Sequence, residues 1–184
     1  MSKNTTQLAL AESLKQQLRR RQFDDITVAD ICEPVGVSRR SFYRYFADKY
    51  DLLSWIYRET YESLLSFNED RVSWDYFSVC CEHLYSDRAF YRNAIAVEGQ
   101  NSLRSLWREL LTPVIAHDFK DIVPSRKTGE FWIWRITDAL FDTLYDWLKK
   151  EPCTPPLEFA SNLRSSLALY CKRGYEISSQ ENTE

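Results

Sequence analysis

Residues that form tight turns are scarce in this sequence: its 184 residues include only four glycines and six prolines. Proteins built from short antiparallel strands need a turn every few residues, and glycine and proline make many of these turns. Apolar residues instead recur at helical spacing along most of the chain, and no segment has a convincing strand pattern. The sequence therefore predicts an all-α fold.

Long apolar runs are also missing. No stretch approaches the roughly 18 residues that are needed to cross a bilayer. The N-terminus lacks an apolar segment followed by the small residues at which a signal peptide is cleaved. The five cysteines are odd in number and irregularly spaced, as expected for free thiols in a reducing compartment. We therefore expect a cytoplasmic protein without a membrane partner.

Side chains suited to catalysis are few. His83 and His117 are the only histidines, and the sequence contains no glycine-rich phosphate loop and no nucleophile elbow. Cys80 and Cys81 lie close to His83, but no second group of cysteines and histidines completes a four-ligand zinc site. We therefore expect a protein that is not an enzyme and that has neither a cofactor nor a bound metal.

Charge is distributed unevenly along the chain. Residues 1–50 contain nine Lys and Arg against six Asp and Glu, whereas residues 51–184 contain fifteen against twenty-one. A basic segment attached to an acidic body indicates that the N-terminal part contacts a polyanion. A charge difference this small is informative only together with a sequence motif. A first helix is predicted over residues 5–21, and residues 27–46 after it contain such a motif.

This motif consists of two short helices joined by a turn. Thr27 is a good N-cap for a helix over residues 28–35, and Gly36 ends that helix because glycine readily adopts positive φ. Ser38 then caps a second helix over residues 39–46. Two short helices with a glycine in the turn between them are typical of a helix-turn-helix.

The second helix has one apolar face. Phe42 and Phe46 lie four residues apart and therefore share the face that packs on the protein. The opposite face is left to polar side chains, among which arginine bonds guanine in a bidentate manner and serine and tyrosine bond phosphates. We therefore predict that this helix enters the major groove of double-stranded DNA. The polar residues on or beside that face are Arg39, Arg40, Ser41, Tyr43 and Arg44.

A family resemblance appears in the same segment. Residues 26–32 (ITVADIC) and 35–49 (VGVSRRSFYRYFADK) resemble the DNA-binding domain of the TetR family of transcription regulators. The glycine, the cap, the aromatic residues and the lysine all fall in register, and the likeness covers about the first 55 residues. Glu33 and Pro34 depart from the family pattern, and the proline is expected to shorten the helix before the turn.

The resemblance implies a domain organisation and a set of DNA contacts. An N-terminal three-helix helix-turn-helix domain is expected over residues 1–50 and a C-terminal helical dimerisation and effector domain over residues 51–177. The polar residues 178–184 are expected to form a disordered tail. The family implies phosphate contacts by Thr27, Tyr43, Tyr45 and Lys49, and base reading by Arg39, Arg40 and Arg44. The complete set of predicted DNA contacts is Thr27, Ser38, Arg39, Arg40, Ser41, Tyr43, Arg44, Tyr45 and Lys49.

The segment over residues 130–150 predicts a dimer. This helix is apolar on two sides, and a helix that is apolar all round must be buried all round. One side suits the helix's own subunit, and the other needs a partner, as does the apolar stripe of a last helix over residues 157–173. TetR-like proteins dimerise through their last two helices, and the alternative is a monomer with a thick core. The predicted interface residues are Trp134, Phe141, Tyr145, Leu148, Leu163, Leu167 and Tyr170.

Aromatic residues are concentrated after residue 50, where all six tryptophans lie. Such residues either line a ligand pocket or form ordinary core. The candidates for an effector pocket are Phe77, Tyr85, Trp107 and Trp132. Residues 49–57 (KYDLLSWIY) also resemble the subgroup related to activators of dihydroxyacetone-kinase operons, which leaves an effector protein as an alternative to a small molecule.

Together these features predict a sequence-specific transcription regulator that binds an inverted-repeat operator as a homodimer under the control of an effector. The alternative is a helical protein–protein adaptor that keeps the fold but has lost DNA binding. The arginines at positions 39, 40 and 44 favour the regulator because they are suited to contact DNA.

Overall fold

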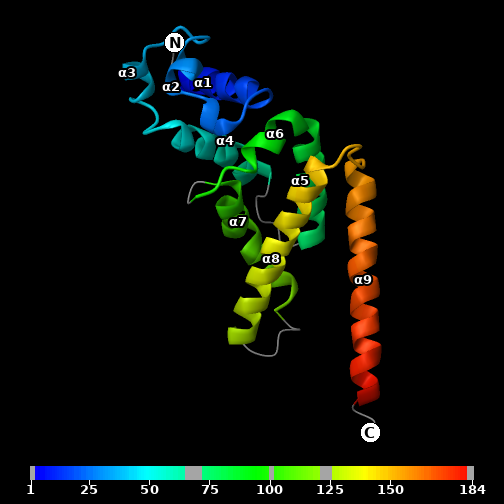
Figure 1. Ribbon diagram of the computed structural model, residues 1–184. Helices are drawn as coiled ribbons and strands as arrows, with labels where there is room; N and C mark the ends of the chain where they lie inside the picture. The colour runs from blue at the N-terminus through cyan, green and yellow to red at the C-terminus, as the bar shows by residue number, and fades with distance from the viewer. Residues whose placement is uncertain (1–2, 65–71, 100–101, 121–125, 182–184) are drawn as a thin grey trace.

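The computed structural model describes residues 3–64, 72–99, 102–120 and 126–181, and every regular element in these ranges is helical (Figure 1). The predicted all-α fold is therefore confirmed. In chain order the elements are α1 (Lys3–Leu18), the 3₁₀ turn η1 (Phe23–Asp25), α2 (Val28–Cys32), α3 (Arg39–Phe42), α4 (Lys49–Leu64), α5 (Ser73–Ser86), α6 (Arg88–Ala94), α7 (Leu103–Asp118), α8 (Arg126–Lys149) and α9 (Pro156–Glu181).

The first three helices and the start of α4 form a headpiece at one end of the molecule (Figure 1). α1 packs on α2 and α4, and α2 packs on α3. Burial of apolar side chains from each helix stabilises this small unit. Its buried residues include Leu10, Leu14, Leu18, Ile31, Phe42 and Phe46.

Helix α4 joins the headpiece to helices α5 to α8, which we call the body. The ring of Trp55 lies 5.8 Å from that of Phe46 in the headpiece. Two residues further along, the hydroxyl of Tyr57 donates a 2.9 Å hydrogen bond to the carbonyl of Ala94 in α6. One continuous helix therefore crosses the domain boundary predicted at residue 50, with no linker there.

The body is built from α5 to α8, and the most extensive packing lies between α7 and α8. Trp107 of α7 meets Phe141 of α8 edge to face, with 5.9 Å between ring centres. Both rings are almost fully buried at this junction of α7 and α8.

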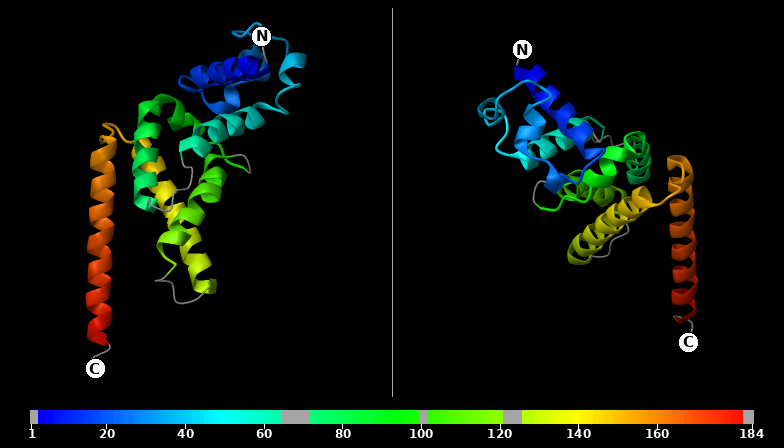
Figure 2. Two further views of the ribbon diagram at one scale, coloured as in Figure 1. Left: turned by 180° about the vertical axis from the view of Figure 1, so that it is seen from behind. Right: turned by 45° about the horizontal axis from the view of Figure 1, so that its top comes forward.

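Helix α9 lies against α5 near its own start and then runs on past the other helices (Figures 1 and 2). Leu169 and Tyr170, in its second half, are 69% and 80% exposed. The helix continues to Glu181, so the prediction of a disordered tail from residue 178 is wrong for residues 178–181, while residues 182–184 lie outside the described residues.

Both helices of the motif are shorter than predicted. α2 ends at Cys32, two residues before Pro34, which agrees with the expected effect of that proline. α3 ends at Phe42 because the chain tightens there: Arg44 N–H bonds Ser41 O and Tyr45 N–H bonds Phe42 O, both across three residues.

Among the described residues, no helix combines the length and apolar character that crossing a bilayer requires.

Candidate nucleic-acid interface

The first helix of the motif, α2, begins with a capping box. The Thr27 hydroxyl accepts a hydrogen bond from Asp30 N–H at 3.2 Å, and the Asp30 carboxylate accepts one from Thr27 N–H at 2.7 Å. These bonds satisfy backbone donors that the helix leaves free at its start. They also lower the pKa of Asp30, with the Thr27 backbone and side-chain bonds as the main causes.

The turn and the second cap have the predicted geometry. Gly36 has φ of +69°, a conformation that glycine adopts without steric cost. Ser38 follows with extended backbone angles, and its side chain accepts a 3.1 Å hydrogen bond from Ser41 N–H. The start of α3 is therefore fixed in direction by local chemistry alone.

The outer face of α3 is opposite its buried ring. Phe42 is fully buried and Phe46 is nearly so. Arg40 and Arg44, two residues to either side of Phe42, are exposed, and Tyr43 is half-exposed. This spacing of two residues on a helix points the guanidinium groups away from the core.

The two neighbouring arginines are in different surroundings. Arg39 lies three residues before the buried Phe42 and therefore on the same side of α3, although its own side chain is exposed. Arg40 lies two residues before Phe42 and therefore on the opposite side of α3. Of the two candidates for base reading, the geometry favours Arg40.

Lys49 has an environment that its sequence position did not reveal. Its ammonium donates hydrogen bonds to the carbonyls of Phe23 at 2.8 Å, Ile26 at 2.9 Å and Asp24 at 3.3 Å. It also lies 4.5 Å from the centre of the Phe23 ring. All three N–H donors of the ammonium are therefore directed at the η1 turn, and a phosphate contact would require one of them to leave it.

The headpiece is attached to the body by a second set of contacts. Arg19, just after α1, makes a bidentate ion pair with Asp87, which lies between α5 and α6. Its Nε donates to Oδ1 at 2.9 Å, and a terminal nitrogen of the guanidinium donates to Oδ2 at 2.6 Å. This pair lowers the pKa of Asp87 below its usual value. The amide of Asn93 donates a 2.6 Å bond to the Leu18 carbonyl. This ion pair could not be predicted from the sequence, because a partner 68 residues away leaves no local pattern.

The aromatic residues predicted to line an effector pocket are dispersed. Phe77 and Tyr85 belong to one row of stacked rings that fixes the start of α9 against α5 and the end of α8. Trp107 packs on Phe141, and Trp132 packs on Phe119 with 4.6 Å between ring centres. The structure therefore places these four rings in three different packing contacts.

Two residues predicted at the dimer interface are buried inside the subunit. Phe141 is 2% exposed and Leu148 is fully buried, so both contact their own chain, and their assignment to an interface is wrong. Trp134 and Tyr170 remain exposed. The side chains of Tyr145, Leu163 and Leu167 are partly covered. The sequence predicted the apolar faces of α8, but it could not distinguish burial within the subunit from burial against a partner.

Comparison with known proteins assigns the chain to a family. Residues 12–55 match the model of the "Bacterial regulatory proteins, tetR family", and residues 73–168 match a "Transcriptional regulator C-terminal region" model. The chain belongs to the TetR family. This confirms the resemblance seen in the helix-turn-helix, and the proteins of this family are regulators and not enzymes.

Individual relatives agree with this assignment. The chain is 26% identical over 113 residues to the HTH-type dhaKLM operon transcriptional activator DhaS of Lactococcus lactis subsp. lactis (strain IL1403). That alignment spans 60% of this chain and only 60% of the relative's length.

Two solved structures share the fold. One is described as the dihydroxyacetone kinase operon activator DhaS, with a TM-score of 0.65 at 18% identity over 91% of this chain and 96% of that one. The other is a TetR transcriptional regulator from Streptococcus agalactiae 2603V, with a TM-score of 0.68 at 16% identity over 86% and 91% of the two chains.

Proposed function

We propose that this protein is a sequence-specific DNA-binding regulator that recognises an inverted-repeat operator as a homodimer. The observation that carries the proposal is the outer face of α3, where Arg40, Tyr43 and Arg44 surround a helix start fixed by Ser38. A recognition helix needs one face seated in the protein and one face of base-reading and phosphate-bonding groups. A regulator of this kind works where the chromosome is, so the proposal includes a cytoplasmic location.

The proposed dimer is supported by the uneven burial of the apolar side chains along α9. Phe159, Leu163, Leu167 and Tyr170 follow one another at helical spacing and form a single stripe. The first two pack on the body, whereas Tyr170 is 80% exposed, because α9 runs past the helices that cover its start. An apolar stripe that extends beyond its own subunit is suited to pack against a second copy of the chain that is related by a two-fold axis.

The surface available to that second copy includes the first half of α8. Phe131 and Trp134 are 67% and 44% exposed there. Figure 1 places this end of α8 at the level of the projecting half of α9. We therefore expect the interface to combine the start of α8 with the second half of α9, in place of the buried Phe141 and Leu148.

Selection of random duplex DNA on the purified protein tests the proposal. The enriched sequences are expected to be inverted repeats whose half-sites are about one helical turn apart, roughly 34–36 Å, or a multiple of it. Binding should weaken steeply as salt increases, because phosphate contacts release counterions. An adaptor that had lost DNA binding would enrich no sequence, and a monomeric reader would enrich a single half-site; either result contradicts the proposal.

Lys49 tests how the headpiece is positioned. Lys49→Met leaves three carbonyls of residues 23–26 without their donor, and bonds from a charged group contribute about 1.5–3 kcal/mol each. We expect a lower unfolding temperature and weaker binding to all DNA sequences, with an unchanged salt dependence. Lys49→Arg, whose planar fork does not match three converging carbonyls, should be impaired in the same way.

The measurements are thermal unfolding and operator affinity over a range of salt concentrations. A phosphate contact by Lys49, as the family resemblance implies, would give a different result. Lys49→Met would then flatten the salt dependence by about one counterion, and Lys49→Arg would bind normally.

A further inference from the structure

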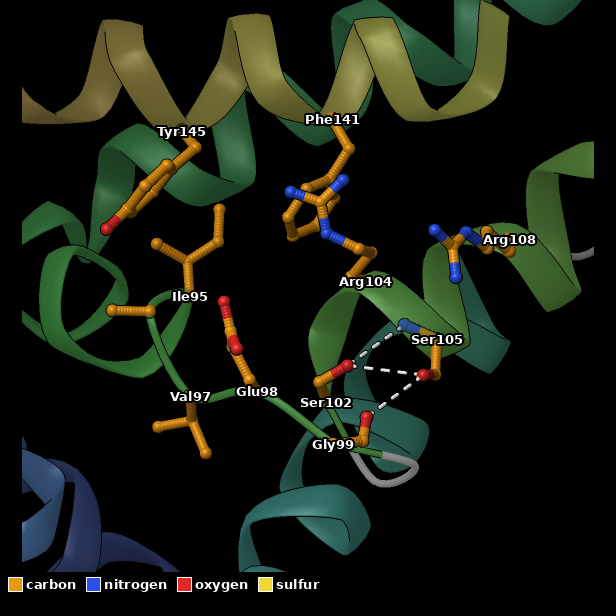
Figure 3. A pocket seen from close by; sticks show the side chains of 11 residues that line it. Ile95, Val97, Glu98, Gly99, Ser102, Arg104, Ser105, Arg108, Phe141 and Tyr145 are labelled. Carbon is orange, nitrogen blue, oxygen red and sulfur yellow. Dashed lines mark hydrogen bonds between the residues drawn. The ribbon is translucent and has the colours of Figure 1, made fainter. Parts of the chain in front are cut away.

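A cavity of about 290 Å³ lies between α7, the second half of α8 and the segment of residues 95–99 that leads out of α6 (Figure 3). Its volume is at the lower end of the range for small-molecule sites, roughly 300–1,000 Å³. Ile95, Val97 and the ring of Tyr145 form an apolar side, while Glu98, Arg104 and Ser105 form a polar one.

The charges on the α7–α8 side of the cavity balance one another. Arg108 bonds both oxygens of Asp138, at 2.7 and 2.9 Å, and Asp138 is only 7% exposed. Arg104 pairs with Asp142, lies 3.7 Å from Asp138, and has its guanidinium 4.5 Å above the ring of Phe141. The stack on Phe141 and the pair with Asp142 fix the direction of the Arg104 fork at the edge of the cavity.

Glu98 is a charged residue on the polar side of the cavity, and it has no charged partner among the described residues. No hydrogen bond or ion pair joins its carboxylate to another of the described residues, and Figure 3 shows it pointing toward α8 beside Arg104. A guanidinium has five N–H donors, and the bonds of Arg104 to Asp142 leave others free for a ligand oxygen. The cavity therefore offers a free carboxylate and free guanidinium donors next to an apolar surface.

We propose that this cavity binds a free L-amino acid as the effector of the regulator. The ammonium would pair with Glu98, the carboxylate would bond Arg104, and an apolar side chain would lie on Ile95 and Tyr145. A simple anion suits the site poorly, because Glu98 would repel it. A simple cation leaves the guanidinium donors unused, so a zwitterion matches both charges.

The effector role rests on the proposed function. A segment that lines two neighbouring cavities connects the ligand site to the headpiece. Residues 96–98 also line a second cavity of about 360 Å³, whose other side is formed by Phe23, Asp24 and Tyr50. Phe23 and Asp24 are two of the residues whose carbonyls hold Lys49. A ligand that moves Glu98 therefore acts on the wall that faces the η1 turn, and it shifts DNA affinity if it favours one position of that wall.

Calorimetric titration of the full-length protein without DNA tests the site. A thermal-shift screen of the common L-amino acids at about 10 mM first detects sites of millimolar affinity or better, since ligand binding raises the unfolding temperature. L-Leucine is then compared with 4-methylpentanoate, which lacks the ammonium, and with 3-methylbutylamine, which lacks the carboxylate. We expect each analogue to bind about tenfold more weakly or worse, because each loses one charged contact.

Two variants test which residue binds each charged group of the amino acid. Glu98→Gln is expected to weaken leucine about tenfold or more but not to weaken 4-methylpentanoate, whereas Arg104→Gln should weaken leucine but not 3-methylbutylamine. Glu82→Gln, an exposed glutamate of α5 outside the cavity, is the matched control and should bind leucine normally. Circular dichroism and operator binding without amino acid verify that the variants fold.

Three outcomes overturn the site: no amino acid stabilises the protein, both analogues bind as well as leucine, or Glu98→Gln binds leucine as the control does. Because the titrations contain no DNA, a protein that selects an inverted repeat but fails them refutes the amino-acid site alone. A protein that binds leucine but selects no DNA refutes the regulator instead.

Discussion

Tyr170→Glu is expected to convert the protein from a dimer to a monomer at micromolar concentration without loss of helix. Tyr170 is 80% exposed in the single chain, so a charge there costs the isolated subunit little. In the proposed dimer the same charge would be buried against the partner without a counterion, which is strongly unfavourable. Operator affinity should then fall by several orders of magnitude, because one half-site offers half the phosphate contacts.

Sedimentation measures the assembly, and circular dichroism verifies the fold. Arg164→Glu is the matched control, since it adds the same glutamate to α9 at an exposed position that is already charged. Leu167→Glu is a less certain test because Leu167 is half-buried in the subunit and its replacement can also unfold the chain. A Tyr170→Glu protein that still sediments as a dimer with full operator affinity would contradict the proposed interface.

Arg40→Ala is expected to weaken operator binding by about 1–3 kcal/mol, or roughly 5- to 150-fold, and to relax the preference at one position of each half-site. The physical reason is the bidentate bond that an outward guanidinium makes to one guanine. Ser38 and Phe42 fix the helix on which Arg40 lies, so the loss should come from the removed contact and not from movement of α3.

Arg39→Ala provides the comparison, because Arg39 carries the same charge one residue earlier but lies on the same side of α3 as the buried Phe42. It should weaken operator and non-specific DNA by similar small factors. The measurement is the selected sequence profile of each variant beside that of the unmodified protein. If Arg39→Ala relaxes one operator position while Arg40→Ala relaxes none, the assignment of the base reader is reversed.

The local elements of the motif were predictable because their causes lie within a few residues. The cap at Thr27, the positive φ of Gly36 and the cap at Ser38 all agree with the prediction from the sequence. The lengths of α2 and α3 were overestimated, since a periodic apolar pattern does not distinguish a helix from a tight turn with three-residue bonds.

Interactions between distant segments could not be predicted in this way. The carbonyls that hold Lys49 belong to residues 23–26, and the partner of Arg19 lies 68 residues along the chain. Neither contact leaves a pattern in the sequence, because nothing near Lys49 or Arg19 differs from an ordinary exposed cation. The cavity that contains Glu98 and Arg104 is also formed only when α7, α8 and the end of α6 come together.

The sequence by itself therefore determined the helical class of the fold, the caps of the helix-turn-helix and the apolar and polar faces of α3, since each depends on backbone geometry and side-chain spacing within one or two turns. Only the tertiary structure decided which apolar faces are covered. Phe141 and Leu148 are buried by the subunit itself, while Tyr170 projects beyond it. The reason is that burial of an apolar face is favourable against any apolar surface, so its neighbour is chosen by the packing of the whole chain and not by the helix that carries it.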